Sequence, residues 1–200
     1  LLKLTLMNIK LIYITFFFSI LFGSGGYDHG TSAGKGNLDI SLTFNPFNYF
    51  EQGQSYMVLG YGITNRFDFH GYFSASNNKD GNYYAGFSYQ FYKSSKFDFS
   101  TAIGIRKYVN NSITHIFTPQ LLYTFHLNNR IDIGGSVVEI RNQNLKTSLG
   151  VASDLFLKYK FFENQKYKIE LSLGAFNPVL WQPKNGDWYP TYSIDIKFKR

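Results

Sequence analysis

Residues 57–73 read MVLGYGITNRFDFHGYF, and large apolar residues occupy every second position on both sides of a short polar interruption. Met57, Leu59 and Tyr61 precede the interruption at Thr64-Asn65-Arg66, and Phe67 and Phe69 follow it. Successive side chains of a β-strand point to opposite faces, so this period of two predicts two strands that each have one apolar face. The short polar interruption predicts a tight turn, and the whole stretch predicts a β-hairpin.

The same alternation recurs along the rest of the chain, and no window after the first residues shows a helical period. It predicts ten strands, at residues 38–44, 57–63, 67–73, 83–91, 97–105, 113–125, 131–137, 149–161, 167–175 and 192–198. The predicted fold class is therefore all-β.

The predicted connections alternate between two kinds. Tight turns are expected at residues 64–66, 93–96, 128–130 and 163–166. Longer polar links are expected at residues 45–55, 76–82, 107–112, 141–144 and 177–188. Strict alternation of this kind indicates an up-and-down antiparallel sheet, with short turns at one end and longer loops at the other.

Composition limits the class of protein further. The chain has 200 residues, which suits one domain, and 20% of them are aromatic while only 16% are charged. It contains no Cys, which excludes a disulfide scaffold, a thiolate zinc site and a cysteine nucleophile. The abundance of large apolar residues argues against intrinsic disorder.

The first residues differ sharply from the rest. A basic start at Met7-Asn8-Ile9-Lys10, an uncharged stretch at 11–22 and small residues at 23–26 follow the order of a secretory signal peptide. We therefore expect a signal peptide at 1–26, a Gly-rich N-terminal tail at 27–37 and a barrel at 38–200. An uncleaved membrane anchor is the alternative, although the uncharged stretch is short for a spanning helix.

Alternation alone does not say which face is inside, because a soluble ligand-binding barrel alternates with its faces reversed. The polar face is rich in Gly, Ser, Thr and Tyr and poor in long charged residues at strand centres, unlike a surface in contact with water. Rings gather beside the tight turns, as in an interfacial aromatic girdle, at Phe67, Phe91, Phe97, Phe125, Phe161, Tyr167 and Phe198. With the predicted export signal, these features place the polar face inside and the apolar face against lipid.

Residues 38–200 thus resemble the Gram-negative outer-membrane β-barrels. Residues 60–69 look like a porin-type hairpin, and residues 192–198 form an alternating final strand that ends on an aromatic residue. The resemblance is to an architecture and not to a particular family. It implies a transmembrane barrel of about ten strands in the bacterial outer membrane, with short periplasmic turns, longer outer loops and outer-membrane lipids as partners.

The polar face would carry most of the titratable side chains of the strands. These candidate lumen-lining residues are Asp39, Asp68, His70, Asp98, Arg106, Asp132, Asp154, Lys158, Lys168, Glu170, Asp195 and Lys197. The interior of a barrel this small is narrow and largely filled by side chains. The set is therefore either a paired polar network or a constriction that selects small solutes by charge.

Other chemistry has little support in the sequence. Asp68, His70 and Ser74 share one strand face, but nothing in their spacing singles out a catalytic set, so we expect no enzyme. Four scattered His residues predict no metal site or cofactor, and His115 is expected on the apolar face. The scattered basic residues form no nucleic-acid-binding patch.

The resulting prediction is a small porin-like channel for small polar solutes. A structural or surface-recognition barrel with a plugged lumen is the main alternative. A lipid-modifying barrel enzyme and a soluble lipocalin-like carrier are further alternatives. Charge selectivity and oligomeric state are left open.

Overall fold

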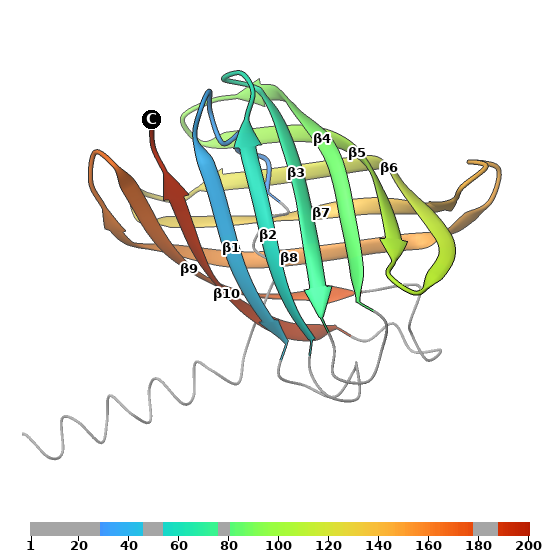
Figure 1. The fold of residues 1–200 in the computed structure, drawn as a ribbon. Helices are drawn as coiled ribbons and strands as arrows, with labels where there is room; N and C mark the ends of the chain where they lie inside the picture. Colours follow the sequence, from blue (N-terminus) through green and yellow to red (C-terminus); the bar gives the residue numbers. More distant parts are fainter. Residues whose placement is uncertain (1–28, 46–53, 76–80, 178–187) are drawn as a thin grey trace, which may run out of the picture.

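The computed structural model describes residues 29–45, 54–75, 81–177 and 188–200, and the predicted signal peptide lies outside them. Ten antiparallel strands form one closed barrel (Figure 1). They are β1 (Leu38–Asn45), β2 (Gln54–Gly62), β3 (Phe67–Ala75), β4 (Asn82–Lys93), β5 (Phe97–Tyr108), β6 (Asn111–His126), β7 (Ile131–Asn142), β8 (Ser148–Glu163), β9 (Tyr167–Asn177) and β10 (Tyr189–Phe198). The predicted all-β, up-and-down fold is confirmed.

Pairing between the first and last strands closes the barrel. β1 runs antiparallel to β10, from the Leu38–Phe198 pair to the Phe44–Tyr192 pair, and also pairs with β2 on its other side. Every strand therefore has two hydrogen-bonded neighbours. Closure removes the unpaired edges that could not be satisfied in a hydrocarbon environment.

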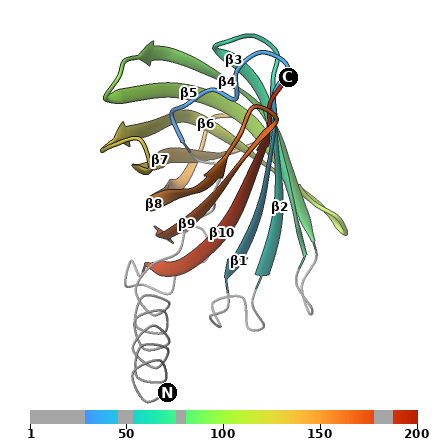
Figure 2. The ribbon, with the colours of Figure 1, turned by 90° about the vertical axis from the view of Figure 1, so that its left-hand side faces the viewer.

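The connections at one end of the barrel, which we call the turn end, are residues 63–66, 94–96, 127–130 and 164–166. Side chains stabilise these turns: Oδ1 of Asn164 accepts backbone N–H bonds from Lys166 and Tyr167, each at 2.8 Å. The C-terminus lies at this end, and the opposite end is the loop end (Figure 2). One loop-end link differs from the prediction, because residues 107–112 contain only a two-residue connection at Val109 and Asn110.

The two faces of the wall differ as the alternation predicts. On β8, Leu155 and Leu157 are 47% and 43% exposed on the outer face, whereas Asp154, Phe156 and Lys158 are buried inside. The same contrast recurs around the barrel, so the outer surface is a band of large apolar side chains. This inversion of the usual soluble pattern is the architecture of an outer-membrane β-barrel.

A β-bulge in β6 overturns one prediction. The register between β6 and both of its neighbours shifts between Phe117 and Gln120. A shift of one residue moves the following side chains to the other face of a strand. His115 therefore lies opposite Arg106 on the inner face, with its Nδ1 atom 2.8 Å from Arg106 Nη2. The expectation that His115 faces the apolar side is wrong.

The interior also holds more apolar side chains than the prediction of a polar face suggests. Leu122, Ile140 and Phe156 are almost completely buried inside the barrel. Gly134 makes room for one of them, because a Cβ atom there would lie 2.5 Å from Cζ of the Phe156 ring. An aromatic ring can thus lie flat against the wall where the neighbouring strand has glycine.

Candidate functional site

The chain before β1, which we call the N-terminal segment (residues 29–36), lies inside the ring of strands (Figure 1). Its Gly30 is held by two wall residues. The Gly30 N–H donates to Thr124 Oγ1 at 3.0 Å, and Ser100 Oγ donates to the Gly30 carbonyl at 2.7 Å. Gly30 also contacts the wall closely, since a Cβ atom there would lie 2.3 Å from the Asp98 carbonyl oxygen.

The other part of the segment is bound by Asp68 of β3. Oδ1 of Asp68 accepts a bond from Ser32 Oγ at 2.7 Å, and Oδ2 accepts one from the Ala33 N–H at 2.8 Å. The Gly36 N–H then donates to the Gly62 carbonyl of β2 at 2.7 Å. Two charge-assisted bonds to one carboxylate make this the strongest anchor of the segment.

Three lysines and three carboxylates on adjacent strands form what we call the lysine network. Its ion pairs are Lys158–Asp195 at 3.0 Å, Lys168–Glu170 at 2.7 Å and Lys197–Asp39 at 3.3 Å. The network spans β8, β9, β10 and β1, and Ser172 Oγ also donates to Asp195 Oδ2 at 2.8 Å. Pairing of this kind compensates for placing charges away from bulk water.

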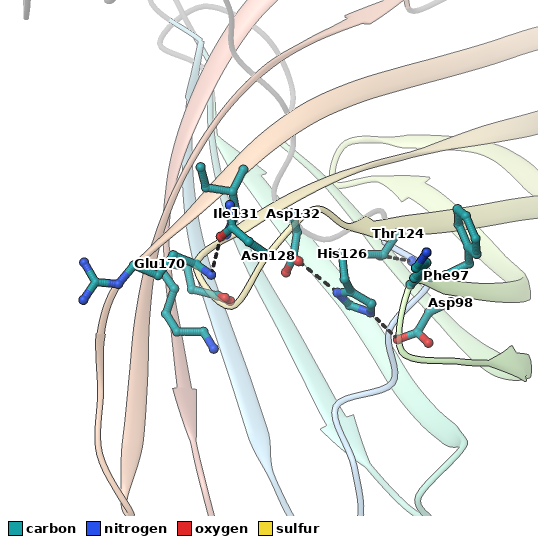
Figure 3. Close-up of polar contacts among 12 residues, drawn as sticks. Phe97, Asp98, Thr124, His126, Asn128, Ile131, Asp132 and Glu170 are labelled. Carbon is teal, nitrogen blue, oxygen red and sulfur yellow. Dashed lines mark hydrogen bonds and ion pairs between the residues drawn. The ribbon is translucent and has the colours of Figure 1, made fainter.

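An imidazole bridges two further carboxylates on β5 and β7 (Figure 3). His126 Nδ1 lies 2.9 Å from Asp132 Oδ1, and His126 Nε2 lies 3.1 Å from Asp98 Oδ2. A neutral imidazole has only one N–H, whereas a carboxylate only accepts hydrogen bonds. Both contacts are therefore hydrogen bonds only when His126 is an imidazolium.

A cavity of about 350 Å³ separates the N-terminal segment from the lysine network. His29, Thr31 and Ala33 line it from the segment, and Leu122 and Phe156 line it at mid-barrel. Exposed turn residues, among them Asn128 and Asn129, also line it, so the cavity reaches the turn end. Burial lowers the pKa of His29 well below its ordinary value, and the nearby lysines lower it further, so this side chain is neutral.

Aromatic residues fill one side of the lumen nearer the loop end. We call Tyr56, Tyr72, Tyr84 and Phe117 the ring cluster. The rings of Tyr72 and Tyr84 stack at 5.4 Å, and Phe117 lies 5.4 Å from Tyr84. The guanidinium of Arg106 lies 4.9 Å from the Phe117 ring centroid, and the Tyr84 ring fits because Gly104 has no side chain.

Hydroxyl and amide groups tie the ring cluster to the wall. The Tyr84 hydroxyl lies 3.1 Å from His70 Nε2 and accepts a bond from Gln120 Nε2 at 2.9 Å. Asp68 and His70, which share a strand face, are thus engaged separately, one with the N-terminal segment and the other with Tyr84.

All twelve candidate lumen-lining residues have inward-facing side chains. Asp39, Lys158, Lys168, Glu170, Asp195 and Lys197 come together in the lysine network, and Asp98 and Asp132 meet at His126. Asp154 lies apart from both groups and accepts a short bond from the Ser136 N–H. The seven candidate girdle residues lie on the outer face near the turn end, where Phe97 and Phe125 pack edge to face at 5.2 Å.

Sequence reasoning missed the N-terminal segment and the ring cluster. A signal for the segment exists, because Gly30, Ser32, Gly34 and Gly36 put a small residue at every second position. Gly62 on the wall complements this pattern, since a Cβ atom there would lie 1.9 Å from the Gly34 carbonyl oxygen. The ring cluster leaves no comparable signal, because inward and outward aromatic residues alternate on the same strands.

The described residues contain neither a metal-binding cluster nor a spanning helix. No group of three or more His, Asp or Glu side chains among them is arranged to hold a metal ion. Within the same ranges, no helix has the length and apolar character needed to cross a membrane.

The chain was compared with known protein families, curated proteins and solved structures, and only the solved structures include similar chains. No family model matches the chain, and no curated protein matches it either. Among solved structures, the chain is similar to the KdgM porin, with 10% identity, 82% of this chain and 99% of that chain covered, and a TM-score of 0.48. It is also similar to the N-terminal β-barrel domain of Pseudomonas aeruginosa OprF, with 10% identity, coverage of 82% and 98%, and a TM-score of 0.34. The strand pairing itself shows the closed ten-stranded antiparallel barrel.

Proposed function

We propose that this protein is a channel of small conductance in the Gram-negative outer membrane, and that it passes small polar solutes. The observation that carries the proposal is the combination of an apolar outer band with an ionic interior. A barrel with this polarity is stable where its surroundings are lipid and its lumen is hydrated.

Strand length supports a membrane location. Spanning strands need about 9–11 residues when tilted. Here β2 and β3 have 9 residues each and β9 has 11. The proposed girdle at the turn end, exemplified by the exposed rings of Phe97 and Phe198, would lie at the level of the lipid headgroups. Outer-membrane lipids are therefore the proposed partners of the outer face.

The N-terminal segment limits the solutes to small ones. It occupies the lumen at the turn end and narrows the path to the cavity beside the lysine network. Ionic side chains facing that path favour hydrated polar solutes over apolar ones.

Single-channel recording in planar bilayers tests the proposal. The wild-type protein is expected to give small, discrete conductance steps. Gly62→Ala is expected to enlarge them, because its new Cβ atom would lie 1.9 Å from the Gly34 carbonyl oxygen and displace the segment. Gly60→Ala is the matched control on the same face of β2, where the new Cβ atom makes only an ordinary 3.5 Å contact with Asp39.

A structural barrel with a closed lumen is the second candidate. It is favoured by the ring cluster and by the buried side chains of Leu122 and Phe156, which fill much of the interior at mid-barrel. A protein that folds, as judged by heat-modifiable gel mobility, but stays silent in both wild-type and Gly62→Ala forms would establish this candidate and contradict the channel.

A further inference from the structure

The cavity beside the lysine network holds polar atoms that lack hydrogen-bond partners. On the strand side, Oδ1 of Asp39 and Oδ1 of Asp195 are buried and unpartnered. On the side of the N-terminal segment, His29 Nδ1 and Thr31 Oγ1 are also buried and have no hydrogen-bond partner. Asp195 is only 8% exposed, and its second oxygen is already bound by Lys158 and Ser172. Buried polar atoms are normally satisfied, so the residues that carry these four atoms have unused hydrogen-bonding capacity beside the cavity.

Charges of both signs line the cavity in nearly equal number. Four ammonium groups face five carboxylates, namely Lys158, Lys160, Lys168 and Lys197 against Asp39, Asp68, Asp132, Glu170 and Asp195. His126 also lines the cavity, and its protonated form, in which both carboxylate contacts are hydrogen bonds, would bring the positive groups to five. Since the formal charges then cancel, the lining as a whole favours neither a net anion nor a net cation.

We propose that the cavity binds a small zwitterionic solute of the amino-acid class. The ammonium group of such a solute would bind the carboxylates of Asp39 and Asp195, whose unpartnered oxygens would turn toward the cavity to accept its N–H bonds. Its carboxylate would accept from the ammonium groups of the lysine network and from the Thr31 hydroxyl. A volume of about 350 Å³ lies at the lower end of the range for small-molecule sites.

This inference names the solute class of the proposed channel and rests on that function for the route by which solute arrives. The charge pattern also explains why a simple ion is a poor occupant. A simple anion would leave the unpartnered Asp39 and Asp195 oxygens without donors. A simple cation would leave the Thr31 hydroxyl, and the N–H donors that the paired lysines do not use in their ion pairs, without an acceptor. Only a solute that carries both an ammonium and a carboxylate group supplies donors to the acceptor atoms and an acceptor to the donor atoms of the cavity.

Isothermal titration of the folded barrel in detergent tests the site with four-carbon probes of similar size. The probes are 4-aminobutanoate, butanoate, butylammonium and 1-butanol. We expect 4-aminobutanoate to bind at least about tenfold more tightly than each of the others, a difference of about 1.4 kcal/mol. Equal affinity for all four, tighter binding of either simple ion or no binding of 4-aminobutanoate would overturn the proposal.

Two single substitutions should shift the preference in opposite directions. Lys158→Gln leaves one negative charge in excess and is expected to raise the affinity for butylammonium relative to butanoate by about tenfold, while Asp195→Asn is expected to do the reverse. Arg141→Gln and Glu139→Gln are the matched controls. They change the same charges in an ion pair of 2.7 Å that lies outside the cavity, and should change neither preference. Shifts in the same direction for both cavity variants would contradict the assignment.

A double variant keeps the test decisive if a single variant fails to fold. Lys158→Gln combined with Asp195→Asn preserves the charge balance, and heat-modifiable mobility reports its folding. A folded double variant is expected to lose the preference for 4-aminobutanoate, and retention of the preference would overturn the proposal. A silent barrel that binds 4-aminobutanoate would contradict the channel alone, whereas a conducting barrel without the preference would contradict the site alone.

Discussion

The half of the lumen near the turn end and the half near the loop end contain different kinds of side chain. Next to the turn end, the interior holds the lysine network, the His126 bridge, the N-terminal segment and a cavity of about 350 Å³. Toward the loop end, the β2–β6 side is filled by the stacked rings of Tyr72 and Tyr84 and by Phe117. One half is ionic and hollow, while the other is aromatic and packed.

In the proposed channel, this contrast would separate the part of the lumen that stabilises the barrel from the part that contacts solute. Stacked rings fill the lumen with few unsatisfied groups, so they stabilise the wall in the manner of an ordinary core. Ionic side chains need water, partners or a solute, so they fit the half that contains the cavity. We infer that the packed half supports the barrel and that the ionic half handles the solute.

The largest effect is expected from emptying the packed half. Tyr84→Ala removes a ring that is 4% exposed and stacks against Tyr72 and Phe117. It should lower the free energy of unfolding by about 3–5 kcal/mol, the usual cost of deleting a buried ring. Urea unfolding in lipid vesicles measures the change. Tyr83→Ala, on the outer face of the same strand, is the control, and an equal loss there would remove the distinction between packed interior and outer band.

A smaller effect is expected from weakening the N-terminal segment in the ionic half. Ser100→Ala deletes the 2.7 Å hydrogen bond to the Gly30 carbonyl and leaves that buried oxygen without its donor. Local opening of the segment should become easier by about 0.5–1.5 kcal/mol, seen as faster amide hydrogen exchange at Gly36. Ser88→Ala, on the inner face of β4, is the control. Unchanged exchange in Ser100→Ala would show that the segment does not depend on this anchor.

The smallest effect is expected outside both halves, at the rim of the turn end. Lys199 Nζ lies 2.6 Å from Glu163 Oε1 in a partly exposed ion pair. Exposed pairs contribute little, so Lys199→Gln should cost about 0.2–1 kcal/mol of unfolding free energy and less at high salt. A loss as large as that of Tyr84→Ala would mean that the rim, and not the packed half, controls stability.

Most of the fold is predictable, because large apolar residues occupy every second position in nearly every strand. Met57, Leu59 and Tyr61 lie on the outer face as the alternation requires, and closure follows from pairing β1 with β10. The alternation also predicts that Asp68 and Lys158 face the lumen, where both side chains lie. It fails at His115, because a bulge shifts the phase of β6 between Phe117 and Gln120. Pro119 is the local signal of this bulge, since a paired strand interior tolerates proline only at such an irregularity.

The arrangement of the site is less predictable, because it depends on contacts across the lumen. Nothing near Asp68 in the sequence indicates that Ser32 and Ala33 bind it from 36 and 35 residues away. The ion pair between Lys158 and Asp195 likewise joins β8 to β10, which are not neighbours in the barrel. Strand patterns assign a side chain to a face, but its partners inside depend on depth and on what else enters the lumen.

A single-cysteine scan along residues 154–159 of β8 tests the orientation of the wall most directly, and the natural absence of Cys gives a clean background. Each cysteine would carry an environment-sensitive fluorophore in vesicles containing a lipid-borne quencher. We predict strong quenching at positions 155, 157 and 159 and weak quenching at 154, 156 and 158. Uniform quenching, or the opposite alternation, would contradict the placement of the apolar face against lipid.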